Sequence, residues 1–175
     1  MPFFWLPEDT LHYRARVDHV PYETWNAHGL FNTTDGNVVD YRAIRMFIAE
    51  LYTQYNIKEI AYDRWQATEM VQNLMEDGYT MVPFGQGFRD MSPPTKELLR
   101  LVLTKQIAHD GNPVLRWMVD NAIVKTDPAG NIKMDKEKSQ EKIDGAIAMV
   151  MALDRALRHE AEKASVYDER EMIVF

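Results

Sequence analysis

The chain has 175 residues, of which 46% are hydrophobic and 27% charged, with 8 glycines and 8 prolines. This composition is typical of one globular domain and excludes a disordered or collagen-like chain. The absence of cysteine excludes disulfides, thiolate zinc sites and cysteine nucleophiles. No apolar run reaches the ~18–20 residues that cross a bilayer, and the N-terminus lacks the pattern of a signal peptide. We therefore expect a soluble cytoplasmic protein that has no membrane partner.

The charge balance is acidic, since 20 lysines and arginines stand against 27 aspartates and glutamates, for a formal net charge of −7. A domain that binds DNA by itself through the phosphates is usually basic. A nucleic-acid role therefore needs a local basic patch, a bound metal ion, or a larger assembly that brings the DNA to the chain. Carboxylates in clusters are also the ligands that hard divalent cations prefer.

The first forty residues contain three of the eight prolines and many aromatic residues, which predicts an irregular segment packed against other parts of the chain. A helix is expected from the N-cap Asp40 to about Tyr55, because apolar residues there recur at helical spacing. A short β-compatible stretch, 57–62, follows and ends at Asp63. A second helix is expected from about residue 66 to a stop at Gly78.

Residues 80–84 predict another strand, which Pro83 restricts to an edge of a sheet. After a turn, Ser92 and the two prolines behind it predict the N-cap and first turn of a third helix. Two short β-compatible stretches flank the turn at 127–130 and predict a hairpin.

The last helix is expected over roughly 138–160, in a single domain that covers residues 1–160. A charged tail is expected over 161–175. This order of helices and strands predicts an α/β layer fold with a mixed sheet. The strands are few for so many helices, which indicates that part of the sheet is missing.

Asp63 and Asp144 are the carboxylates in the most informative positions. Asp63 ends a predicted strand directly before a helix, where α/β folds gather their ligands, but an aspartate there could also cap the helix. Asp144 lies beside the apolar stripe of the last helix, where an ionised carboxylate is costly unless it is paired or binds a metal ion. Its alternative partner is a lysine, with candidates at Lys136, Lys138 and Lys142. Two such carboxylates could share divalent cations such as Mg²⁺ or Mn²⁺ in phosphodiester hydrolysis.

Other candidate residues carry weaker signals. The lysines around the hairpin (Lys125, Lys133, Lys136 and Lys138) could grip DNA phosphates or form a solvated face. His109 with Asp110 could be a general acid pair or an ordinary loop histidine, and Trp65 and Trp117 could stack on bases or pack in the core. There is no P-loop, no dinucleotide-binding glycine motif and no nucleophile elbow in this sequence.

Several short motifs occur in one order along the chain: Trp5-Leu-Pro-Glu8, Gly36-Asn-Val-Val-Asp40, Ile60-Ala-Tyr-Asp-Arg-Trp65, Phe84-Gly-Gln-Gly-Phe88, Met91-Ser-Pro-Pro-Thr-Lys-Glu97, Asn112-Pro-Val-Leu-Arg-Trp-Met118, Asn121 and Lys142-Ile-Asp-Gly-Ala-Ile-Ala148. Together they resemble the C-terminal nuclease half of the large terminase subunit of tailed bacteriophages and prophages. The resemblance covers residues 3–158.

The resemblance implies an RNase H-like fold, in which helices flank a mixed sheet and acidic residues bind Mg²⁺ or Mn²⁺. It implies a two-metal-ion endodeoxyribonuclease that cuts concatemeric double-stranded viral DNA during packaging, with Asp63 and Asp144 as catalytic metal ligands. The implied partners are the terminase ATPase domain, the small terminase subunit and the portal protein.

The resemblance also implies that the chain lacks the family's first strand, with its catalytic aspartate, and the P-loop ATPase. We therefore expect an unpaired edge on strand 57–62 and weak metal binding and cleavage by the chain alone. The alternative function is an inactive prophage-derived fragment that serves only as a structural or interaction module of the packaging motor.

Overall fold

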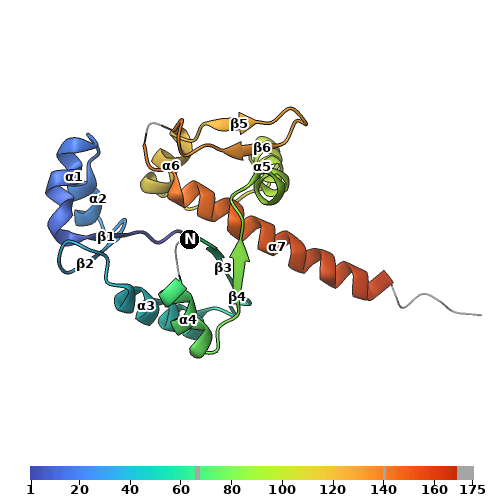
Figure 1. Cartoon of the computed structure of the whole chain (residues 1–175), viewed down its shortest axis with the longest axis horizontal. Coiled ribbons are helices and arrows are strands. Elements are labelled where there is room, and N and C mark those ends of the chain that lie inside the picture. The colour runs from blue at the N-terminus through green and yellow to red at the C-terminus, as the bar shows by residue number, and fades with distance from the viewer. Residues whose placement is uncertain (66–67, 140, 169–175) are drawn as a thin grey trace, which may run out of the picture.

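The computed structural model describes residues 1–65, 68–139 and 141–168, and Figure 1 shows the order of its elements. The first forty residues, expected to be irregular, contain several short elements: β1 (Trp5–Pro7), a 3₁₀ turn (Glu8–Thr10), α1 (Leu11–Val17), α2 (Tyr22–Ala27) and β2 (Asn32–Thr34). β1 and β2 pair in parallel. Elements this short carry too few residues for a periodic pattern, so the sequence does not reveal them.

The predicted helix–strand–helix–strand segment is confirmed. α3 (Tyr41–Gln54) begins after Asp40, whose side chain accepts a hydrogen bond from the backbone N of Arg42 at 2.9 Å. The other three elements are β3 (Ile60–Asp63), α4 (Thr68–Glu76) and β4 (Met81–Phe84). β3 and β4 pair in parallel, with Asp63 opposite Phe84.

The helix start predicted at Ser92 is wrong. α5 (Phe88–Leu103) begins five residues earlier, with an extended Gly87 in the N-cap position, and contains both prolines within it. The Ser92 hydroxyl does not cap the helix, because its Oγ accepts a hydrogen bond from the backbone N of Ile132 in the hairpin at 3.1 Å. Met91, one turn into the helix, is buried, so packing supports the turn that the sequence pattern did not include.

The hairpin is confirmed as β5 (Val124–Thr126) and β6 (Ile132–Met134), whereas a helix before it was not expected. That helix, α6 (Pro113–Asp120), begins after Asn112, whose side chain caps the backbone N of Val114 and of Leu115. Asn followed by Pro is a helix-start signal, because Asn can cap the helix and Pro fits its first turn.

The last helix, α7, runs over Asp144–Asp168 and therefore begins later than expected. Residues 135–139 are tied to the start of the hairpin, because the Ser139 hydroxyl donates to the backbone oxygen of Asp135 and accepts from the backbone N of Ile123. The helix continues past residue 160 into the segment expected as a tail, and 169–175 lie outside the described residues.

The strands of the described residues form three separate two-stranded sheets, and two of these sheets are parallel. The α/β class is confirmed. Within the same residues β3 and β4 pair with each other, so each strand, including β4 with its Pro83, lies at an edge of this two-stranded sheet.

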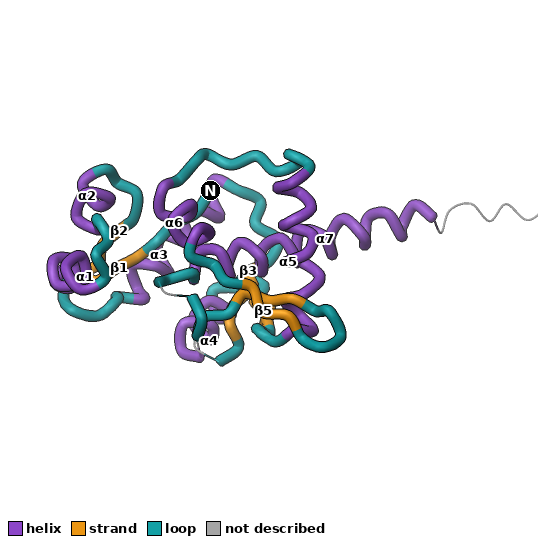
Figure 2. The backbone as a smooth tube through the Cα atoms, turned by 90° about the horizontal axis from the view of Figure 1, so that it is seen from above, coloured by secondary structure: helices purple, strands orange, loops and turns teal. Residues whose placement is uncertain are grey.

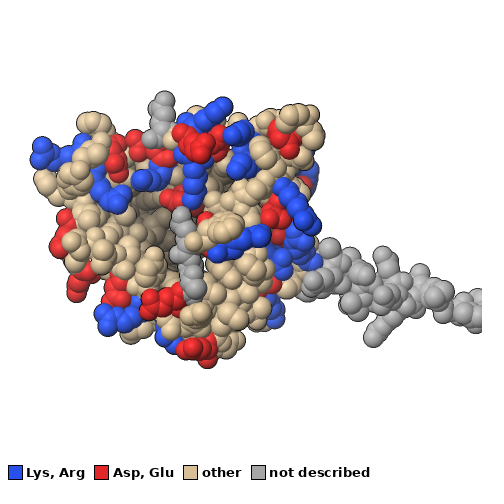
Figure 3. Space-filling view, viewed as in Figure 1, with Lys and Arg blue, Asp and Glu red and all other residues tan. Residues whose placement is uncertain are grey.

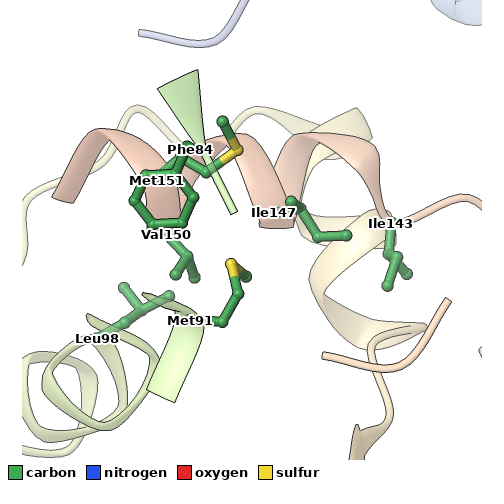
Figure 4. Close-up of a cluster of buried hydrophobic side chains, with 7 residues drawn as sticks. All are labelled: Phe84, Met91, Leu98, Ile143, Ile147, Val150 and Met151. Carbon is green, nitrogen blue, oxygen red and sulfur yellow. The ribbon is translucent and has the colours of Figure 1, made fainter. Parts of the chain in front are cut away.

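α7 organises the fold. Figure 1 shows α7 as a long rod with α5, α6 and the hairpin on one side and α3, α4 and the β3–β4 pair on the other, and Figure 2 shows α1 and α2 at the end far from its C-terminus. Its buried side chains pack with residues of β4 and α5 in one core cluster: Phe84, Met91, Leu98, Ile143, Ile147, Val150 and Met151 (Figure 4). A second cluster joins the N-terminal segment to α6 and contains Leu11, Val20, Tyr22, Phe31, Val114 and Met118.

Shortening Met91 to alanine is expected to lower the free energy of unfolding by about 2–5 kcal/mol, because the side chain is 1% exposed and its loss leaves a cavity between α5 and α7. Urea unfolding followed by circular dichroism measures this change. Leu103→Ala on the same helix is the matched control, since that side chain is 73% exposed. An equal effect of the two variants would contradict the assignment of Met91 to the core.

Candidate active site

Asp63 lies at the carboxyl end of β3 and is half-buried. Side chains alternate along a strand, so Asp63 shares a face with Ala61, which packs against the core cluster on α7. Its Oδ1 accepts a hydrogen bond from the backbone N of Trp65 at 3.2 Å, and its Oδ2 accepts one from Gln86 Nε2 at 2.9 Å. Asp63 therefore holds the turn after the strand, and each carboxylate oxygen retains a lone pair for a further partner.

Asp144 is the first residue of α7 and follows the buried Ile143. Its side chain is 65% exposed, so it lies at the surface and not within the apolar stripe. Lys136 Nζ is 2.8 Å from its Oδ1, which is the lysine partner that the sequence offered as the alternative to a metal ion. A negative charge is also favoured at the N-terminus of a helix.

The two aspartates lie on elements that pack together, but they do not touch. In Figure 4, Phe84, which is opposite Asp63 in the sheet, lies beside Val150 and Met151, at the far end of the cluster from Ile143. Ile143 and Val150 are separated by about 10 Å along the helix axis. No hydrogen bond or ion pair joins Asp63 to Asp144 in the part of the chain that the structure describes. That the two share an ion site stays a prediction.

Of the four lysines around the hairpin, one contacts Asp144 and one contacts the turn that bonds to Asp63. Lys133 Nζ donates to the backbone oxygen of Gln86 at 3.3 Å and lies 5.4 Å from the centre of the Phe88 ring. Lys136 pairs with Asp144, and Lys125 lies 3.9 Å from the buried Asp135, while Lys138 is exposed. Figure 3 shows basic and acidic side chains interspersed over the face in view.

A cavity of about 420 Å³ adjoins Asp144 and is also lined by Asp18, Glu141, Lys136 and Lys142. The sequence did not single out Asp18 or Glu141 for this site, because only the folded chain brings residue 18 next to the start of α7. The phenol of Tyr22 donates to the Asp18 carboxylate at 3.2 Å. Burial and the charge of Asp18 raise the pKa of Tyr22 far above its usual range, so this phenol stays a donor to Asp18.

Carboxylate oxygens are the donors that hard divalent cations prefer, and both aspartates have oxygen lone pairs left to coordinate a cation. Within the described ranges, however, no three histidine, aspartate or glutamate side chains are grouped so that they could hold a metal ion. These residues thus provide suitable donors without forming a complete ligand set.

The structure distinguishes between the alternative roles considered for His109, Trp117 and Trp65. His109 Nδ1 accepts from the backbone N of Gly111 in a loop, as expected for an ordinary loop histidine. Trp117 packs edge-on against Tyr22 and Trp25, so it belongs to the core. Trp65, two residues after Asp63, is 81% exposed and is therefore not a core residue.

Asp63 at the end of a parallel strand and Asp144 at the start of a long helix are the residues that the resemblance implies as metal ligands. Residues 2–160 match the family model described as the terminase large subunit, endonuclease domain, and the chain belongs to this family.

Among known proteins, the terminase large subunit of Enterobacteria phage HK97 is 38% identical over 170 residues, which cover 96% of this chain and 34% of that protein. Protein YmfN of Escherichia coli (strain K12) is 33% identical over 92% of this chain and 37% of its own length. The crystal structure of the HK97 bacteriophage large terminase matches 89% of this chain and 33% of its own with a TM-score of 0.82 and 39% identity. An RNase H-like fold is consistent with this match. The chain spans about a third of the length of these relatives.

None of the described helices contains a segment with the length and hydropathy of a membrane span.

Proposed function

We propose that this chain is the metal-dependent endonuclease portion of a DNA-packaging terminase, which cuts concatemeric double-stranded phage DNA in the cytoplasm of a bacterial host. The match of residues 2–160 to the terminase endonuclease family is the observation that carries the proposal. The position of Asp63 supports it, because a carboxylate at the end of a strand is where α/β folds place their reacting groups.

Asp63 and Asp144 would hold Mg²⁺ or Mn²⁺, together with ligands from other residues or from DNA. When bound in a pair, such ions activate a water molecule and stabilise the leaving oxygen of a phosphodiester. The chain's own contribution is to fix Asp63 through Trp65 and Gln86, and to offer lysines to the DNA backbone. Lys138 is exposed, and Lys136 would need to exchange its present partner for a phosphate.

The acidic net charge leaves the chain poorly suited to hold DNA by itself. We therefore propose that the DNA is presented by a terminase ATPase domain, with the small terminase subunit and the portal protein as further partners.

A second candidate function is an inactive structural or interaction module of the packaging motor. The absence of a three-ligand group among the described residues favours this candidate. Both candidate functions are compatible with the same fold and family, so only a test of DNA cleavage distinguishes a nuclease from an inactive module.

Incubation of supercoiled plasmid with the purified chain and Mn²⁺ tests the proposal. Nicking that stops when EDTA removes the metal ion is expected of a nuclease, whereas a module would leave the plasmid intact. Asp120→Asn controls for a contaminating nuclease and for nonspecific loss of charge, because Asp120 is 70% exposed at the end of α6. Metal-independent nicking, or none at any Mn²⁺ concentration, would contradict the proposal.

A further inference from the structure

Gln86 bridges the candidate catalytic strand and the hairpin. It lies in the turn between β4 and α5, where its side-chain Nε2 donates to Asp63 Oδ2 at 2.9 Å. Its backbone oxygen accepts from Lys133 Nζ on β6 at 3.3 Å. Asp63 is 23 residues from Gln86 in the sequence, and Lys133 is 47 residues from it. All three residues are half-buried.

The turn that carries Gln86 is also held from its other side. Arg64, directly after Asp63, pairs with Asp90 in the first turn of α5 at 3.3 Å. This ion pair closes over Gly85, where an added Cβ would collide with both the Asp90 carboxylate and the Arg64 guanidinium. The backbone that presents Gln86 is therefore fixed between an ion pair and a lysine.

The donor that Gln86 offers is neutral, which distinguishes Asp63 from Asp144. The ammonium group of Lys136 forms an ion pair with Asp144 and offsets its negative charge. The neutral amide of Gln86 donates a hydrogen bond to Asp63 without offsetting the charge of that carboxylate. The ammonium group of Lys133 contacts the backbone of the same turn and not the carboxylate. A carboxylate held in one orientation with its charge uncompensated is prepared to receive a cation.

We propose that Gln86 is a positioning residue that orients the Asp63 carboxylate, and that Lys133 holds Gln86 in place from the hairpin. The inference rests on the proposed function, because it assigns Asp63 the binding of a divalent cation. Partners that orient a metal ligand typically contribute 10–100-fold to metal affinity or activity.

Gln86→Met tests this role, because methionine keeps the length of the side chain and removes the N–H donor. We expect the variant to bind Mn²⁺ about 10–100-fold more weakly by calorimetry. The rate constant of plasmid nicking should fall by a similar factor, with little change in the DNA concentration that gives half the maximal rate and with the thermal midpoint retained. Gln54→Met is the matched control, since the side chain of Gln54 is exposed at the end of α3 and donates to Glu50.

Lys133 is tested in the same two measurements. Lys133→Met is expected to weaken Mn²⁺ binding and nicking in the same direction as Gln86→Met, and Lys133→Arg to restore part of both. Lys105→Met is the control, because Lys105 is an exposed lysine after the end of α5 and lies outside the hairpin.

A measurement without metal or DNA tests the contact itself. The side-chain amide resonances of Gln86 in the ¹⁵N spectrum of the full chain should move in Asp63→Ala, and those of Gln54 should not. Unmoved Gln86 resonances would overturn the proposal. So would Mn²⁺ binding by Gln86→Met equal to that of the wild type while Asp63→Asn weakens it. If Asp63→Asn binds Mn²⁺ and nicks DNA as the wild type does, the proposed function fails at Asp63 instead.

Discussion

Asp63→Asn is expected to reduce metal-dependent DNA cleavage by more than about a hundredfold, because loss of a ligand costs more than loss of the partner that orients it. Asparagine keeps the size of the side chain and an oxygen that can accept from the backbone N of Trp65, so the turn after β3 should stay formed. The change removes the negative charge that the cation requires. Asp144→Asn is expected to have an effect of the same order.

The initial rate of plasmid nicking in Mn²⁺ measures both effects, and thermal unfolding verifies that each variant is folded. The exposed Asp120→Asn serves again as the control and should cleave as the wild type does. A folded Asp63→Asn or Asp144→Asn variant with the wild-type rate would remove that aspartate from the candidate site.

Arg155→Met is expected to have a large effect on stability, of about 3 kcal/mol at neutral pH. Arg155 on α7 pairs through two nitrogens with Glu59, just before β3, and the Glu59 side chain is 9% exposed. The variant leaves this carboxylate buried, with His159 Nε2 at 3.4 Å. Urea unfolding at pH 7 measures the loss, and Arg42→Met is the control, since its pair with Asp40 lies at the surface and should contribute little.

The same ion pair predicts a pH dependence. Hydrogen bonds from Arg155, and to a lesser extent the charge of His159, lower the pKa of Glu59 in the folded chain. A lowered carboxyl pKa stabilises the fold above the ordinary pKa of about 4.3, and this contribution disappears as the pH falls through the lowered value. The stability difference between wild type and Arg155→Met should therefore shrink below about pH 4. A difference that stays constant from pH 7 to pH 3 would show that lost packing, and not charge, causes the effect.

The sequence predicts those parts of the fold that depend on local periodicity and capping. α3 with its Asp40 cap, the β3 and β4 strands and the hairpin turn all follow from such signals. The α5 start was misplaced because the Ser92 hydroxyl bonds to the hairpin, a tertiary contact 40 residues away that no local pattern contains. α6 was not predicted, although Asn112 as the N-cap and Pro113 in the first turn are a local signal for the start of a helix.

The candidate site divides in the same way. The position of Asp63 at a strand end and the proximity of a lysine to Asp144 are readable from the sequence, and the structure places Lys136 on Asp144. The contact of Gln86 with Asp63 could not be predicted from the sequence. It depends on the parallel pairing that sets Asp63 opposite Phe84, which brings the Gln86 side chain within hydrogen-bonding distance of Asp63. Asp18 similarly joins the cavity near Asp144 only through the packing of the N-terminal segment.

A crystal of the chain soaked in Mn²⁺ and measured at the manganese absorption edge tests most directly whether the two aspartates serve one metal centre. We predict anomalous density that connects Asp63 and Asp144 through one ion or through two ions about 3.5–4 Å apart, with the Lys136 ammonium moved away from Asp144. Manganese at neither carboxylate, or bound at sites that the two do not share, would contradict this account.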